Sequence, residues 1–66
     1  MPVASHIKAA EDHKSCAAAH QSAADLHSKG DHTAACDKSA AAKSCCDTAH
    51  KSSNLAHVKS AEHAKT

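Results

Sequence analysis

Histidine and cysteine are the residues of this sequence whose types and spacing could do chemistry. Eight His and four Cys occur among 66 residues, and such a composition is typical of metal binding. Four histidines recur every seven residues: His6, His13, His20 and His27. Because seven residues make nearly two helical turns, this spacing predicts one row of imidazoles along a helix.

Shorter spacings also favour chelation. His32 and Cys36 are four residues apart, as are Cys46 and His50, which places two donors on adjacent turns of one helix face. In the second half of the chain, a seven-residue row consists of Cys36, Lys43, His50 and His57. We expect the buried face of the helices to be made of these His and Cys residues together with Ala.

The elements that position these donors are predicted to be helices. Ala, the best helix former, supplies 17 residues, and Pro2 suits a first helical turn. Gly30 is a natural helix end and Asp31 a cap for the next helix. The sequence therefore predicts an all-α protein: one antiparallel two-helix hairpin domain over 1–66, with helix 3–28, turn 29–31 and helix 32–64.

Large apolar side chains are few and aromatic residues are absent. A chain this short with an alanine core buries little apolar area, so it needs a metal, disulfides or a partner chain. We expect two hairpins to pair as a homodimer in a four-helix bundle.

Folding the hairpin about Gly30 should bring together residues whose numbers add to about 60–63. His13 would then face His50, Cys16 would face Cys46, and His6 would face His57. The predicted first metal site comprises His13, Cys16, Cys46 and His50, with His20 as a substitute. A second site would use His27, His32 and Cys36, and a weaker third site His6 and His57.

These donors suit several metals. Two Cys and two His can close a tetrahedral zinc shell, whereas imidazole also suits Cu(II) and Ni(II). Affinity among divalent ions favours copper, so Cu(II) is expected first and Zn(II) or Ni(II) next. Binding should weaken as the pH falls toward about 5, because the ligands must be deprotonated.

Two residues are expected outside the sites, and one alternative stays open. His63 is predicted on the far side of the second helix, and Cys45 is predicted to point away as a free thiol or an inter-chain contact. A disulfide from Cys16 to Cys45 or Cys46 would remove the soft ligands. It would leave an all-His metal surface. The alternative function is a disulfide-stapled structural or chaperone-like hairpin without a metal role.

Several function classes lack support in the sequence. The net charge is +1 and no basic run exists, so no nucleic-acid partner is expected. No apolar stretch approaches the length of a membrane span, so no membrane insertion is expected either. An enzyme is not expected, because 66 residues with an alanine core enclose little volume for a reaction site.

The chain resembles the small histidine-rich metal-binding proteins of ammonia-oxidising bacteria. The resemblance lies in the seven-residue histidine spacing and in two segments, His27-Ser28-Lys29-Gly30-Asp31-His32-Thr33 and His57-Val58-Lys59-Ser60-Ala61-Glu62-His63-Ala64. It implies a periplasmic helical protein that binds copper and other divalent metals for buffering or delivery. This chain differs in having four Cys and in being shorter. With no signal peptide in the sequence, a native start at Met1 would instead imply the cytoplasm.

Overall fold

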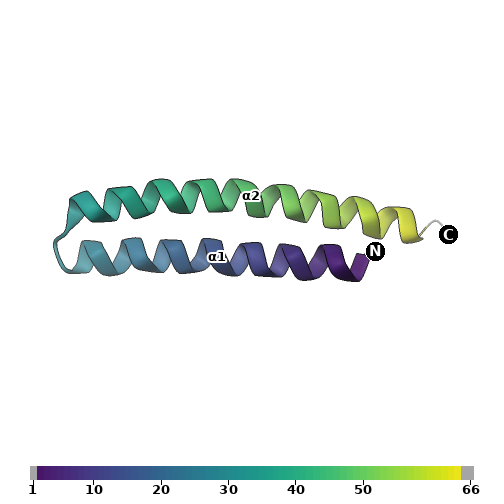
Figure 1. Cartoon of the computed structure of the whole chain (residues 1–66), viewed down its shortest axis with the longest axis horizontal. Coiled ribbons are helices and arrows are strands. Elements are labelled where there is room, and N and C mark those ends of the chain that lie inside the picture. The colour runs from purple at the N-terminus through teal and green to yellow at the C-terminus, as the bar shows by residue number, and fades with distance from the viewer. Residues whose placement is uncertain (1, 65–66) are drawn as a thin grey trace.

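The computed structural model describes residues 2–64 as two long helices. Helix α1 spans Pro2–Ser28 and helix α2 spans His32–Ala64, and the two run antiparallel, side by side (Figure 1). The molecule is a rod of 54 × 13 × 11 Å. The predicted all-α helical hairpin is confirmed. Met1, Lys65 and Thr66, the outer residues of the expected domain, lie outside the described range.

Backbone hydrogen bonds explain why the chain reverses at residues 29–31. Gly30 adopts a φ of +82°, and its N–H donates to the carbonyl of His27 at 3.0 Å, while the N–H of Asp31 donates to the carbonyl of Leu26 at 2.9 Å. These two bonds form a Schellman motif, which satisfies the last carbonyls of α1. The Asp31 carboxylate then caps α2 by accepting the N–H of Ala34 at 3.2 Å.

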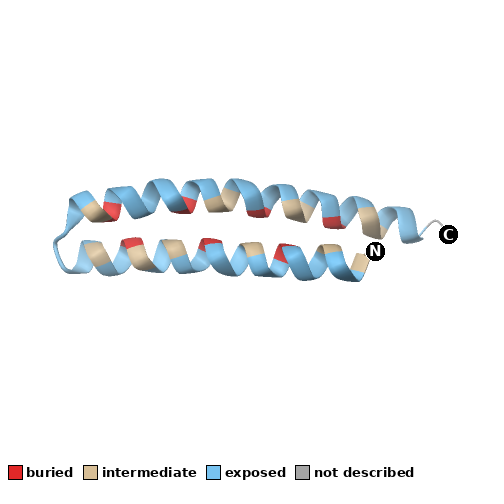
Figure 2. Ribbon diagram, viewed as in Figure 1, coloured by how far each residue is buried: buried red, intermediate tan, exposed pale blue. Residues whose placement is uncertain are grey.

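The core is a narrow seam of small side chains. Every seventh residue is buried, namely Ala9, Cys16 and Ala23 in α1 and Ala35, Ala42, Ala49 and Ala56 in α2. In Figure 2 these residues line the inner sides of the facing helices. Such spacing is that of a coiled-coil seam, and alanine lets the two backbones approach closely.

The expectation that histidines share the buried face is wrong. Each heptad histidine of α1 is exposed, and His13, His20 and His27 each follow a buried residue by four positions. Four residues turn the helix by about 40° past a full turn, which moves the imidazoles from the seam to its edge. An imidazole is too large for the space that alanine fills.

Neither helix, within the described residues, carries a stretch that is apolar enough to cross a membrane.

Candidate metal centre

A disulfide joins the two helices near the middle of the hairpin. Cys16 occupies the seam seven residues after Ala9, and its Sγ is bonded to Sγ of Cys46 on α2. The two Cα atoms are 5.3 Å apart, within the usual range for disulfides. The predicted opposition of Cys16 and Cys46 is confirmed. Of the two disulfides that the sequence left open, the structure contains the one to Cys46.

His20 adds a third donor to this pair. Its Nε2 atom lies 3.4 Å from Sγ of Cys46, and because a disulfide sulfur carries no hydrogen, the imidazole N–H is the donor. The ligand atoms of Cys16, His20 and Cys46 all lie within 4.8 Å of one another. Among residues 2–64, this is the only group of three or more such ligands that close together. The residue expected as a substitute ligand thus lies at the centre.

The three donors fit a metal ion once the disulfide is reduced. Zinc–sulfur and zinc–nitrogen bonds of about 2.3 and 2.0 Å in a tetrahedral shell place donors about 3.3–3.8 Å apart. The three ligand atoms, which all lie within 4.8 Å of one another, are near enough for such a shell, provided that the two bonded sulfurs move apart. While the disulfide is closed, however, neither sulfur is a thiolate, and the thiolate is the form that ligates metals.

Two other heptad histidines bond to serines of α2. Nε2 of His6 lies 2.7 Å from Oγ of Ser60, and Nε2 of His13 lies 2.6 Å from Oγ of Ser53. The expected partners were His57 and His50, so the predicted facing pairs differ from the structure. His50 and His57 are exposed, each one residue past a buried alanine of α2. Whether these four histidines ligate a metal stays a prediction.

The lean of helical side chains explains the difference in register. Side chains point back toward the N-terminus of their own helix, and in an antiparallel pair the two leans are opposite. A side chain of α1 therefore meets one whose Cα lies further along α2. Consequently, the residue numbers of His6, His13 and His20 and of their contact partners on α2 add to 66. Counting from the turn alone predicted sums of about 60–63. These three histidines and their partners Ser60, Ser53 and Cys46 form one edge of the hairpin.

At the turn, two imidazoles meet directly. Nδ1 of His27 and Nδ1 of His32 are 2.8 Å apart, with ring centroids at 5.0 Å and ring planes inclined by 38°. Cys36, the third expected ligand there, is exposed. It does not form a three-ligand group with them in the described part of the chain.

The other edge of the hairpin carries no histidine row. Here the Asp12 carboxylate accepts hydrogen bonds from the Ser52 hydroxyl and from Nζ of Lys8, the latter at 3.0 Å. The Ser52 bond, followed by that of Lys8, holds the pKa of Asp12 below its ordinary value. The bond between Asp12 and Ser52 joins the two helices on this side, and no spacing in the sequence predicted it.

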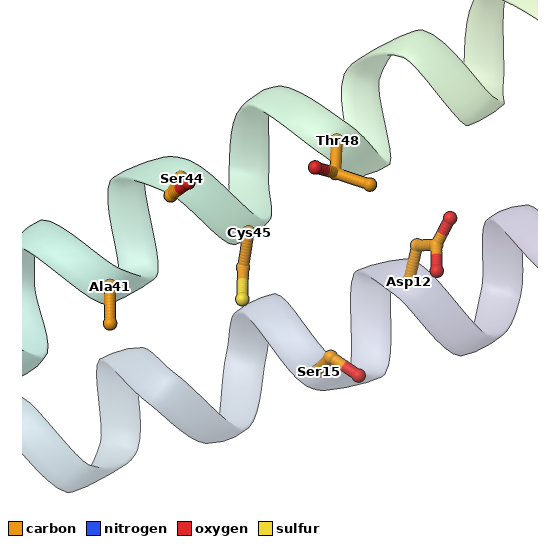
Figure 3. A pocket seen from close by; sticks show the side chains of 6 residues that line it. All are labelled: Asp12, Ser15, Ala41, Ser44, Cys45 and Thr48. Atoms are coloured by element: carbon orange, nitrogen blue, oxygen red, sulfur yellow. The ribbon is translucent and has the colours of Figure 1, made fainter.

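A groove of about 510 Å³ lies beside Asp12 and contains the half-buried Cys45. Its other lining residues are small or polar: Asp12, Ser15, Ala41, Ser44 and Thr48. Figure 3 shows the Cys45 side chain directed toward α1. Cys45 carries a free thiol, which is one of the two expected states. The expectation that it points away is wrong, because its half-buried side chain lines a groove between the two helices.

His63 differs in part from its expected place. It is exposed, but it follows the buried Ala56 by seven residues and so continues the inner face of α2. The expectation of the far side is wrong for this residue, because the seam lies at the alanines rather than at the histidines.

Comparisons with known protein families, with curated proteins and with solved structures each find no match to this chain. The case for function accordingly depends on the geometry of these donors.

Proposed function

We propose that this protein is a non-enzymatic metal binder that buffers, sequesters or delivers a transition metal. The observation that carries the proposal is the clustering of the Cys16, His20 and Cys46 ligand atoms within 4.8 Å. Three donors of the thiolate and imidazole type leave one tetrahedral position for water or for a ligand from a receiving protein. An open coordination position suits delivery, because a ligand of the receiving protein can bind the metal before this protein releases it.

The redox state of the disulfide would control this centre. A dithiol or two thiol molecules reduce the Cys16–Cys46 bond, supplying two electrons and two protons, and are themselves oxidised to a disulfide. A metal ion then displaces the thiol protons and binds the two sulfurs and Nε2 of His20. The same two sulfurs cannot hold a disulfide and a metal as thiolates together.

For the metal, copper comes first in the proposal and zinc or nickel next. The Irving–Williams order favours copper, and thiolate ligands select Cu(I) or Zn(II). Cu(II) and Ni(II) instead suit the imidazoles outside this centre.

The resemblance to the histidine-rich proteins of ammonia-oxidising bacteria supports a role in periplasmic buffering or delivery. The Cys16–Cys46 disulfide is typical of such an oxidising compartment. There the thiolate centre would form only after a thiol reductant had opened the disulfide.

Calorimetric titration of the reduced and the oxidised protein with Cu(I), Cu(II), Zn(II) and Ni(II) tests the proposal. We expect one Zn(II) or Cu(I) per reduced chain at micromolar affinity or tighter, and loss of that site on oxidation. Cys46→Ser should remove the site, whereas Cys36→Ser, at an exposed free thiol, should leave it intact. Affinities no tighter than millimolar for every ion would refute the proposal.

A second candidate function is a structural or chaperone-like hairpin that needs only its disulfide. The closed Cys16–Cys46 bond favours it, since the bond joins the middles of two helices with an alanine seam. Helicity that depends on the disulfide, but not on added metal or chelator, would support this function over metal binding.

We also propose that two hairpins associate into a four-helix bundle. The larger apolar residues Val3, Ile7, Leu55 and Val58 are 48–67% exposed, and all belong to the end of the hairpin opposite the turn. Sedimentation equilibrium of the wild type and of Ile7→Ser would test this. A wild-type monomer at all concentrations would exclude the bundle.

A further inference from the structure

We propose a second metal site at the hairpin turn, in which Nδ1 of His27 and Nδ1 of His32 bind one Cu(II) or Ni(II) ion. This site shares no ligand with the Cys16–His20–Cys46 centre and requires no reductant. The turn site therefore goes beyond the proposed function. It would remain valid if experiments showed that the thiolate centre binds no metal.

The distance between the two nitrogens is compatible with one shared ion. Nδ1 of His27 and Nδ1 of His32 are 2.8 Å apart. Two metal–nitrogen bonds of about 2.0 Å at a right angle place their nitrogens about 2.8 Å apart, whereas a tetrahedral angle places them about 3.3 Å apart. The hydrogen bond thus holds the two nitrogens at the separation of neighbouring ligands in a square-planar or octahedral ion. Cu(II) and Ni(II) prefer such geometry, and zinc prefers the tetrahedral one. The rings, whose centroids are 5.0 Å apart, must still rotate so that both lone pairs point at the ion.

The turn itself holds the two imidazoles in place. His27 belongs to the Schellman motif, because its carbonyl accepts the Gly30 N–H, and His32 is the first residue of α2, directly after the capping Asp31. Both backbone positions are fixed by hydrogen bonds before any ion arrives. Ligands that are already ordered lose less conformational entropy on binding.

The proton balance permits binding without loss of a net proton. Two neutral imidazoles at 2.8 Å share one hydrogen between their Nδ1 atoms. When a metal takes both Nδ1 atoms, the ring that held its proton there carries it on Nε2 instead. Both side chains are exposed, so water or buffer ligands can fill the other coordination positions.

The helix ends contribute little net attraction. The C-terminal end of α1 favours a cation, and the N-terminal end of α2 disfavours one. These effects oppose each other at the turn, so the affinity must come from the imidazole nitrogens. Substitution of either imidazole should therefore remove most of the binding.

The test uses the oxidised protein, in which the disulfide blocks the thiolate centre, with Cys36→Ser and Cys45→Ser in the background so that no free thiol reduces Cu(II). One equivalent of Cu(II) or Ni(II) is followed by calorimetry and by electron paramagnetic resonance for Cu(II). We expect His27→Asn and His32→Asn each to weaken the first Cu(II) equivalent at least about tenfold. His63→Asn, at an exposed histidine that was expected outside the metal sites, is the matched control and should leave this affinity within about twofold of the unsubstituted value.

A second measurement does not depend on the variants folding. In the otherwise unsubstituted oxidised background, substoichiometric Cu(II) should broaden the imidazole NMR signals of His27 and His32 before those of His6 and His57. Equal broadening of all four, or unchanged affinity in both Asn variants, would overturn the turn site. Neither result bears on Zn(II) binding by the reduced protein, so failure here is distinct from failure of the thiolate centre.

Discussion

The Sγ atom of Cys46 accepts a hydrogen bond from Nε2 of His20 at 3.4 Å while it is covalently bonded to Cys16. The imidazole thus already lies beside the sulfur that becomes a thiolate when the disulfide is reduced. Proton-bearing imidazole can stabilise the thiolate, and neutral imidazole can join it as a metal ligand. His20 can therefore interact with the Cys46 sulfur both when that sulfur is a free thiolate and when it binds a metal.

Substitution of His20 should weaken metal binding by the reduced protein. Loss of a partner that only orients a ligand costs about 10–100-fold in affinity, so loss of a ligand itself should cost at least about tenfold. His20→Asn would be compared with His57→Asn by competition with a chromophoric zinc chelator. Equal affinities for the two variants would remove His20 from the centre.

Opening the disulfide should destabilise the hairpin. Cys16 and Cys46 are separated by 30 residues, and closing a loop of that length stabilises a protein by about 3–4 kcal/mol in the chain-entropy treatment. Urea unfolding followed by circular dichroism should show this loss on adding reductant or in Cys46→Ala. Cys36→Ala, which removes only a free thiol, should unfold like the wild type. If reduction leaves the midpoint unchanged, the alanine seam alone holds the helices.

Metal should restore part of this loss. A ligand that binds only the folded state stabilises it by about 2.7 kcal/mol at a hundredfold excess over its Kd. Zn(II) added to the reduced protein should therefore raise the urea midpoint, and Zn(II) added to reduced Cys46→Ala should not. An equal rise in both proteins would assign the effect to other ligands.

Gly30→Ala should destabilise the turn by about 1–2 kcal/mol. The φ of +82° lies in the region that an L residue with a Cβ avoids. A Cβ added there meets no atom within 4 Å, so the cost is backbone strain alone. Ser28→Ala, in the last turn of α1, is the control. A thermal midpoint for Gly30→Ala equal to that of Ser28→Ala would contradict the φ assigned here.

Asp12 should make stability depend on acid pH. The Ser52 and Lys8 hydrogen bonds lower its pKa in the folded state, so the ionised carboxylate stabilises the hairpin. That stability is fully present above the unfolded value of about 4 and is lost as the pH falls through the lowered folded value. Asp12→Asn should be less stable than the wild type at pH 6, and the difference should vanish near pH 2. Asp37→Asn, at an exposed carboxyl, should show no such difference.

The fold was predictable because its signals are local. The alanine content predicts helices, and the pair Gly30–Asp31, a helix end followed by a helix cap, predicts one tight reversal between them. The Schellman hydrogen bonds explain why the chain reverses at that point. The face that each helix buries was harder to predict. Histidine and alanine rows both recur every seven residues, and only the size of the imidazole decides that alanine takes the seam.

The site was partly predictable for a related reason. Cys16 lies in the seam, where the distance from the turn nearly fixes its partner, so its opposition to Cys46 followed from counting residues. His13 and His20 lie at the edge, where opposite side-chain leans shift the register. The hydroxyl and sulfur partners of these histidines could not be found by counting alone.

The serines opposite His6 and His13 also govern the order in which an ion would meet the hairpin. Each of these imidazoles already has a partner on α2, so a cation there competes with a bond whose net contribution is about 0.5–1.5 kcal/mol. The two imidazoles at the turn bond to each other, so one ion gains two ligands there for a single hydrogen bond broken. Uptake would therefore begin at the closed end of the rod and spread toward the open end as the concentration of ions rises.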